Sequence, residues 1–202
     1  MSASSQSPPT RLLPPYSYVP GHEHPHPVTD PRGHLYGQSH PEALPPEALA
    51  RLPAEPTSRR RALDALLAKA PAWLYALDLF NRGYYWEAHE AWEGFWNQLG
   101  RTTPEAKLVQ GLIHLAAACV KIREGRAEGV KRHTQRAAEL LGQSEAASLG
   151  VTEREFSVAL GLDSNSIARV LLELDRYRPE CWHTSRTPVV RVVAEDLRLA
   201  EP

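Results

Sequence analysis

Apolar side chains recur every three to four residues through most of the chain after residue 41. This period is typical of amphipathic helices. Prolines and capping side chains mark helix starts, and glycines mark several helix ends. Ser58 is the expected cap of the second helix, and Asp163 or Ser164 is the expected cap of the last. The pattern predicts longer helices at 59–70, 71–82, 84–97, 104–124, 126–148 and 164–178, and short helices at 46–52 and after Thr152.

Amphipathic helices with short connections are typical of an all-α fold. We therefore expect a compact bundle of about five to six helices in residues 41–180. A C-terminal tail, residues 181–202, follows the bundle. The run PVVRVV in this tail predicts a short strand or an extended segment.

Residues 1–40 break the helical pattern and form a proline- and histidine-rich arm. Five of the nine histidines lie there, and its many prolines disfavour helices and sheet ladders. Tyr16, Tyr18 and Tyr36 favour an extended arm that wraps on the bundle, because freely solvated linkers contain few tyrosines. We expect the arm to be partly disordered at its start.

The arm contains an alternating histidine motif, formed by His22, His24 and His26. Alternate residues share one face of a strand, but Pro25 and Pro27 favour polyproline geometry, which spreads the imidazoles around the axis. A solvated arm is therefore favoured over a metal site. A bolder hypothesis is that His34 reaches the bundle and completes a site there.

The segment YYWEAHEAWEGFW, residues 84–96, has an aromatic face and a polar remainder when it is drawn as a helix. His89 lies at the edge of the aromatic face, one turn before Glu93, so these two side chains can contact each other. Glu90 lies toward the polar side, and Glu87 lies nearly opposite His89. The wheel therefore predicts a His89–Glu93 pair, without Glu87 or Glu90.

The following helix is apolar nearly all round, which predicts a central position in the bundle. It keeps one polar stripe, formed by Lys107, Gln110, His114 and Lys121. An unpaired buried polar group costs about 1–3 kcal/mol, so we expect His89 and Glu93 of the preceding helix to contact this stripe. Together they predict a polar pocket between the two central helices. Gly111 beside the stripe permits a close helix contact.

His89, Glu93 and His114 would supply a mixed nitrogen and oxygen donor set, which suits zinc, iron or manganese. Helical bundles build metal sites from facing helices in this way. The candidate ligand-binding residues are His89, Glu93, Gln110 and His114. The competing interpretation is a hydrogen-bonded polar network that only stabilises helix packing.

The run from His89 to Glu93 also resembles the HExxH motif of zinc proteases, with Glu93 in place of the second histidine. In a metal-dependent hydrolase, Glu90 or Glu87 would be the candidate catalytic base. Whether the protein is an enzyme is left open by the sequence.

Composition narrows the range of partners. With 23 Lys and Arg against 24 Asp and Glu, the formal net charge is −1, so no strong field favours nucleic acid or an anionic membrane. The basic triplet at 59–61 fits the solvated end of a helix. No secretory signal or membrane span is apparent, and Cys119 fits a buried thiol, so we expect a cytoplasmic protein.

Two runs of residues resemble domain-of-unknown-function family 309. The first is LFNRGYYWEAHEAWEGFW and the second is LVQGLIHLAAACVKIREG. The signature positions are Glu87, His89, Glu90, Glu93 and Trp96 in the first run and Gln110 and Gly111 in the second. The resemblance covers roughly residues 72–145. It implies a compact all-α domain of a bacterial or archaeal cytosolic protein and implies no particular reaction.

Three functional hypotheses follow from these patterns. The leading one is a binding or regulatory module whose pocket holds a small polar ligand or a divalent metal. The second is a metal-dependent hydrolase that uses the His89–Glu93 pair. The third is a structural or interaction protein that forms a homodimer through exposed aromatic residues such as Trp86.

Overall fold

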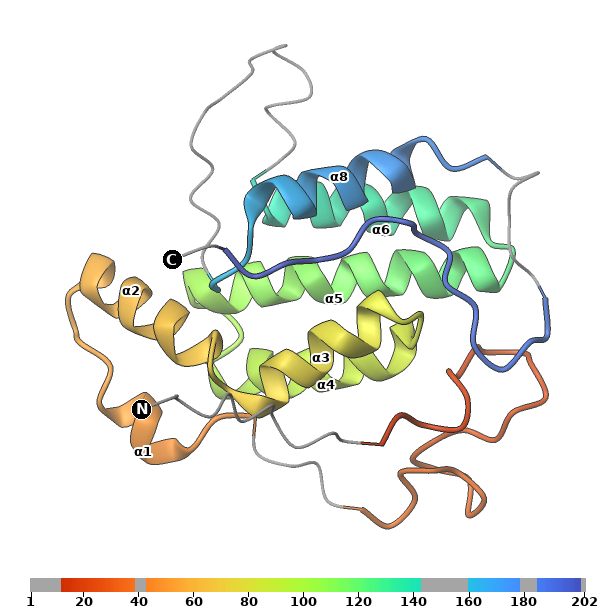
Figure 1. The fold of residues 1–202 in the computed structure, drawn as a ribbon, viewed down its shortest axis with the longest axis horizontal. Coiled ribbons are helices and arrows are strands. Elements are labelled where there is room, and N and C mark those ends of the chain that lie inside the picture. The colour runs from red at the N-terminus through yellow and green to blue at the C-terminus, as the bar shows by residue number, and fades with distance from the viewer. Residues whose placement is uncertain (1–11, 39–42, 143–159, 179–184, 201–202) are drawn as a thin grey trace, which may run out of the picture.

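The computed structural model describes residues 12–38, 43–142, 160–178 and 185–200, and this part of the chain is all-α (Figure 1). Its helices are α1 (Pro46–Ala50), α2 (Pro56–Leu67), α3 (Pro71–Asn81), α4 (Tyr85–Gln98), α5 (Pro104–Arg123), α6 (Ala127–Leu140) and α8 (Ser164–Asp175). The predicted all-α class is confirmed, and the seven described helices slightly exceed the expected five to six. The start of the arm and the helix expected after Thr152 lie outside the described residues.

Proline and capping side chains set most of the helix starts, as the sequence predicts. Thr103 caps α5 by accepting a hydrogen bond from the Ala106 N–H, and Asp163 caps α8. The prediction for α2 is wrong at its cap. Glu55, rather than Ser58, accepts hydrogen bonds from the first-turn N–H groups, and α2 begins at Pro56. Proline suits this first position because its missing N–H would have no helical partner there.

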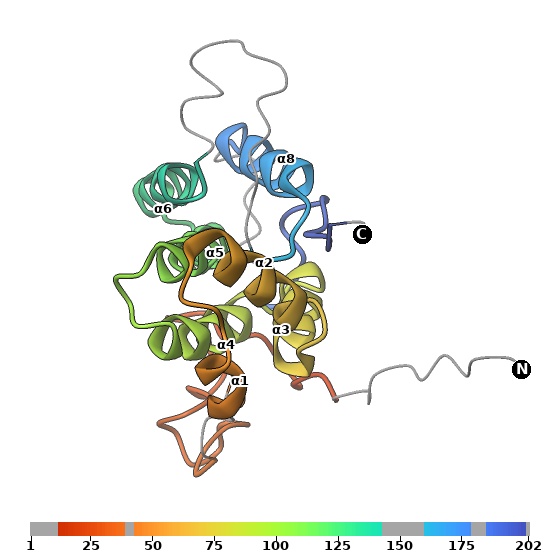
Figure 2. The same cartoon turned by 90° about the vertical axis from the view of Figure 1, so that its left-hand side faces the viewer.

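Helix α5 is the centre of the bundle, as its nearly continuous apolar surface predicts. It packs against α4 on one side and α6 on the other, while α3 packs on α4 and α8 on α6 (Figure 2). Cys119 is fully buried in α5, which fits the expected thiol. A side chain added at Gly111 would place its Cβ 2.6 Å from Leu141 Cγ, so this glycine permits the close approach of the end of α6.

The aromatic face of α4 belongs to the hydrophobic core. Trp92 and Phe95 are buried and pack against Trp73 and Phe80 of α3, with ring centroids 5.0–6.5 Å apart. Trp92 and Phe95 therefore have a packing role. None of the described helices combines the length and apolarity needed to cross a bilayer.

Both ends of the described chain pack on the bundle without forming helices, and turns and bends make up much of the arm. The tail at 185–200 forms no strand beyond a single bridge between Leu162 and Leu199, so its PVVRVV run is an extended segment. The Ser17 N–H of the arm donates to the Pro188 carbonyl of the tail at 2.9 Å. The Tyr18 N–H also donates to Glu87 of α4, so the described arm, residues 12–38, packs on the bundle as the sequence predicts.

The prediction of a solvated arm for the histidine motif is wrong. His24 stacks on Tyr16 with ring centroids 4.7 Å apart, and all three motif histidines are half-buried. The rings of His26 and Tyr18 each pack edge-on against Trp86 and are tilted against each other. The ring centroids of these pairs are 4.8–5.4 Å apart. Neighbouring tyrosine and tryptophan rings give the imidazoles a surface to pack on, which proline geometry alone does not reveal.

Trp86 is consequently half-buried beneath the arm, so its expected exposure is wrong. The arm provides the aromatic contacts that we expected a second copy of the chain to provide. Dimerisation itself stays a prediction.

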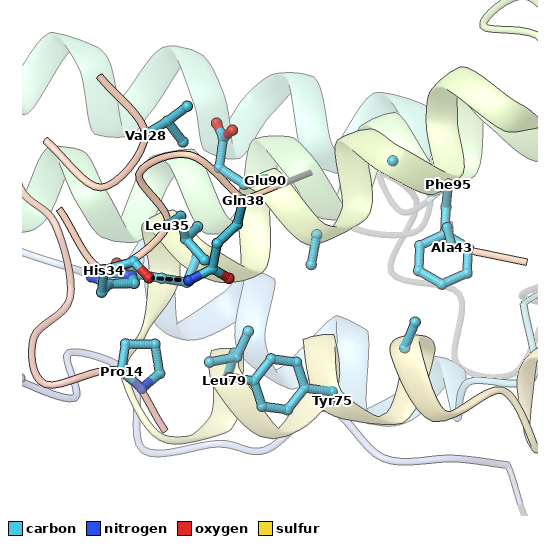
Figure 3. Close-up of a pocket in the computed structure, with 14 residues that line it drawn as sticks. Pro14, Val28, His34, Leu35, Gln38, Ala43, Tyr75, Leu79, Glu90 and Phe95 are labelled. Atoms are coloured by element: carbon cyan, nitrogen blue, oxygen red, sulfur yellow. Dashed lines mark hydrogen bonds and ion pairs between the residues drawn. The ribbon is translucent and has the colours of Figure 1, made fainter. Parts of the chain in front are cut away.

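The arm also closes a cavity of about 120 Å³ against α3 and α4 (Figure 3). The sequence predicts a polar pocket between α4 and α5, whereas this cavity lies on the arm side of α4. Its walls are mainly apolar, with Glu87 and His34 among the polar lining residues.

Candidate functional site

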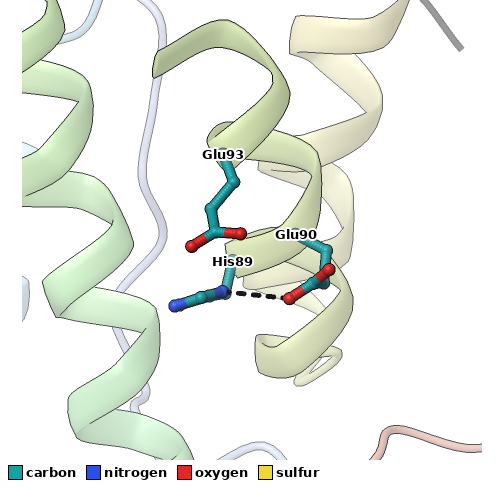
Figure 4. Close-up of side chains that lie close together, drawn as sticks. All are labelled: His89, Glu90 and Glu93. Carbon is teal, nitrogen blue, oxygen red and sulfur yellow. Dashed lines mark ion pairs between the residues drawn. The ribbon is translucent and has the colours of Figure 1, made fainter. Parts of the chain in front are cut away.

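Three side chains of α4 converge: His89, Glu90 and Glu93 (Figure 4). One potential ligand atom from each residue lies within 4.8 Å of the others. His89 Nδ1 lies 3.5 Å from Glu90 Oε1. All three residues are half-buried. We call this cluster the α4 triad.

The triad agrees with the sequence prediction for Glu93 and contradicts it for Glu90. A helical wheel separates Glu90 from His89 by about 100°, which measures the directions of the Cβ atoms only. The glutamate side chain is long and flexible, so its carboxylate returns to the imidazole of the preceding residue. Glu90 is therefore part of the cluster from which the wheel excludes it.

The environment of the triad favours a cation. Two carboxylates flank a single imidazole, and His89 Nδ1 is buried without a hydrogen bond to any described residue. Buried polar atoms are rarely left without a partner. The available donors are one ring nitrogen and carboxylate oxygens, a mixed set that suits zinc, iron or manganese.

His114, the third metal ligand predicted from the sequence, contacts a different partner. Its Nδ1 lies 2.9 Å from Nδ1 of His133 on α6. The sequence predicts that the polar stripe of α5 contacts His89 and Glu93, and this is wrong for His114. Helix α5 lies between α4 and α6, and His114 contacts α6. Gln110 is half-buried on α5 and lies outside the triad.

Both rings of this histidine pair favour the neutral form. Burial, together with the charges of His114 and Arg132, lowers the pKa of His133 to about 4. Burial also lowers the pKa of His114. The charge of His89 contributes to both shifts, so the pair lies within electrostatic range of the triad.

Sequence reasoning missed His133. Its position on the helix offered a signal, because it lies one turn before Ala137 and one turn after Val130, both of which are buried. A histidine at such a position faces the neighbouring helix at the edge of the packed face.

Glu87 lies on the opposite side of α4 from His89, as the wheel predicts. It is only 4% exposed, and the Tyr18 N–H of the arm donates to its Oε1 at 3.0 Å. His34 Nε2 lies 3.7 Å from the same oxygen. His34 therefore reaches the bundle, as the sequence hypothesis proposes, but it lies beside Glu87 and not at the site of His89.

Burial raises the pKa of Glu87 to about 7, and hydrogen bonds from the Tyr18 N–H and the nearby Ser17 hydroxyl oppose this rise. Of the two candidate catalytic bases, Glu87 faces the arm and Glu90 is itself part of the triad. Neither is placed as a separate base beside a metal bound by His89 and Glu93.

Residues 73–133 match the family described as "Domain of unknown function (DUF309)". The match confirms the resemblance seen in the sequence. It extends from the first turn of α3 into α6 and includes the triad, His114 and His133. No curated protein and no solved structure shows significant similarity to the chain.

Proposed function

We propose that the protein is a metal-binding module in which the α4 triad holds a divalent transition metal. The observation that carries this proposal is the convergence of three potential ligand atoms within 4.8 Å of one another. His89, Glu90 and Glu93 are fixed on two successive turns of one helix, so their backbone positions are set before any ion binds.

The geometry is close to that of a bound ion. Donor atoms that bind zinc at about 2.1 Å in a tetrahedron lie about 3.4 Å apart. Small side-chain rotations would bring the donors of the triad to this spacing. Three protein ligands would leave open coordination positions for water or a small polar ligand.

His114 is the candidate further ligand. Neutral imidazole is the form that coordinates metals, and the environment of His114 favours this form. Coordination would require its Nδ1 to exchange the contact with His133 for the metal. The pair also offers a second role, in which His133 orients His114 as a hydrogen-bonded neighbour of the site.

The experiment is metal analysis of the full-length protein. Purified protein is loaded with Zn²⁺, Mn²⁺ or Fe²⁺ under anaerobic conditions and desalted, and bound metal is quantified by elemental analysis. We expect about one ion per chain for the favoured metal. His89→Ala should abolish stoichiometric binding, and Glu93→Gln should weaken it about tenfold or more.

His22→Ala is the matched control, because this arm histidine is half-buried but lies outside the triad. It should bind as much metal as the wild type. His114→Ala distinguishes a further ligand, which would lower the affinity, from a bystander, which would not. Absence of stoichiometric metal in the wild type, or equal binding by folded His89→Ala, would overturn the proposal.

The observations support binding more directly than hydrolysis, because neither Glu87 nor Glu90 is placed as a separate base. Metal-dependent hydrolysis, a cytoplasmic location and a bacterial or archaeal source stay predictions from the sequence.

A further inference from the structure

The cavity beneath the arm is bounded by three segments of the chain. The arm contributes Val28 and Leu35, α3 contributes Tyr75 and Leu79, and α4 contributes Ala91 and Phe95 (Figure 3). A volume of about 120 Å³ is sufficient for a small organic molecule. The apolar walls favour a ligand with a compact hydrocarbon body.

Two carboxylates, Glu87 and Glu90, and the His34 imidazole line this cavity, and the polar groups at the end around Glu87 are mostly acceptors. Glu87 is 4% exposed, and its Oε2 has no hydrogen bond to a described residue. Both ring nitrogens of His34 are also buried without a hydrogen bond to described residues. The Tyr18 N–H already donates to Glu87 Oε1, and the Ser17 hydroxyl lies nearby. The Gln38 amide donates to the His34 carbonyl instead of to this end.

We propose that this cavity binds a small organic ammonium ion, with its hydrocarbon body against the apolar walls and its ammonium group between Glu87 and His34. A primary ammonium has three N–H donors and no acceptor. It therefore matches Glu87 Oε2 and a ring nitrogen of His34, which lack donors. Its positive charge also compensates a buried carboxylate.

Other ligand classes match these groups less well. A carboxylate or phosphate would place a second negative charge beside Glu87. An alcohol of the same size brings one donor and no charge. The volume restricts the body to a short alkyl chain or a small ring.

This inference does not depend on metal binding by the triad. The ligand groups Glu87 and His34 are not members of the triad, although Glu90 both belongs to the triad and lines the cavity. Titrations in the presence of a chelator therefore test the cavity even if the triad binds metal.

The test compares butylamine with 1-butanol, which have the same alkyl chain and differ in the ammonium group. Each is titrated into ¹⁵N-labelled full-length protein at neutral pH with EDTA, and the backbone amide signal of Tyr18 is followed because this N–H contacts Glu87. We expect saturable shifts with butylamine at an affinity about tenfold or more above that of 1-butanol.

Glu87→Gln should remove the preference for the amine, while its amide oxygen can still accept the Tyr18 N–H. Glu139→Gln, an exposed change on α6, is the matched control and should preserve the preference. If 1-butanol binds as tightly as butylamine, or if folded Glu87→Gln keeps the preference, the proposal is rejected. Absence of saturable binding by butylamine and by ethylamine also rejects it.

A second variant tests the location without changing any charge. Gly94 lines the cavity, and a Cβ added there would contact only Ala43 Cβ, at 3.7 Å, among the described atoms within 4 Å. Gly94→Ala should therefore fold and reduce the space for a ligand. It should weaken butylamine several-fold more than ethylamine. Equal effects on both amines would show that the longer alkyl chain does not occupy the space beside Gly94 and would overturn the assignment.

Discussion

Among single residues, Glu87 has the most unusual environment of the carboxylates of α4. Burial penalises its charged form and raises its pKa to about 7, although the Tyr18 N–H hydrogen bond favours the charged form. His34 lies 3.7 Å from its Oε1, Tyr16 and Tyr84 lie within electrostatic range, and the charge of Glu90 contributes to the raised pKa of Glu87. A carboxyl group in this position is partly protonated at neutral pH.

Glu87→Gln should therefore change how stability depends on pH. The folded state binds the Glu87 proton more tightly than the unfolded chain does, because the pKa is raised from 4.5 to about 7. This contribution to the free energy of unfolding is complete below pH 4.5 and is lost as the pH rises to about 7.

The neutral variant should thus gain stability relative to the wild type between pH 5 and 7, on the order of 1 kcal/mol per pH unit. Urea unfolding of both proteins at several pH values measures this difference. A difference that stays constant over the range would contradict the raised pKa of Glu87.

At the scale of secondary-structure elements, two interior helix glycines differ in what surrounds them. Gly111 of α5 faces the end of α6, and an added Cβ would lie 2.6 Å from Leu141 Cγ and 3.3 Å from Leu140 Cβ. Gly94 of α4 faces the cavity, where an added Cβ has only an ordinary contact with Ala43. Local helix propensity is the same at both positions, and tertiary packing distinguishes them.

Gly111→Ala should destabilise the protein by about 1–2 kcal/mol, because forced displacement of α6 outweighs the gain in helix propensity. Gly94→Ala should instead stabilise it by about 0.5–1 kcal/mol. Thermal unfolding of the two variants and the wild type gives both changes. Shifts of the same sign would mean that α6 accommodates the methyl group at Gly111.

At the scale of the whole molecule, the arm and the tail pack on α3 and α4. Tyr85 of α4 is fully buried, and its hydroxyl accepts hydrogen bonds from the N–H groups of Val192 and Val193. Arg123 at the end of α5 donates to the carbonyls of Ser185 and Thr187. The central helices thereby fix a tail that forms no strand in its described residues, 185–200.

Tyr85→Phe should release this tail more than it disturbs the bundle. Two buried N–H groups lose their acceptor, at a cost of about 1–3 kcal/mol. Amide hydrogen exchange should become faster at Val192 and Val193, while the amides of α5 keep their protection apart from the general loss of stability. Unchanged exchange at these two amides would show that another group replaces the hydroxyl.

The local parts of the fold could be predicted from the sequence. Thr103 and Pro104 mark the start of α5, and the leucine and alanine residues along this helix indicate that it is buried. The α2 cap was predicted wrongly because Ser58 is of a favoured capping type and glutamate is not. In the structure α2 begins at Pro56, and the Glu55 carboxylate accepts from the N–H groups of Thr57 and Ser58.

The candidate site was less predictable from the sequence than the helices and their starts. The sequence gives His89 and Glu93 one turn apart on a helix, and this relation is local. The inclusion of Glu90 depends on side-chain rotamers, which a wheel does not represent. The contact of His114 with His133 depends on which helix packs beside α5, and these residues are 19 positions apart in the chain.

The sequence by itself determined the all-α class, the central position of α5, the opposite directions of Glu87 and His89, and the resemblance to the matched family. Each of these follows from periodicity, capping or residue pattern within short segments, where interactions depend on backbone geometry that is the same in all helices. Only the tertiary structure decided that the arm covers Trp86, that His34 meets Glu87, and that the described cavity lies beneath the arm. These contacts join segments far apart in the chain, and their formation depends on the packing of the whole molecule.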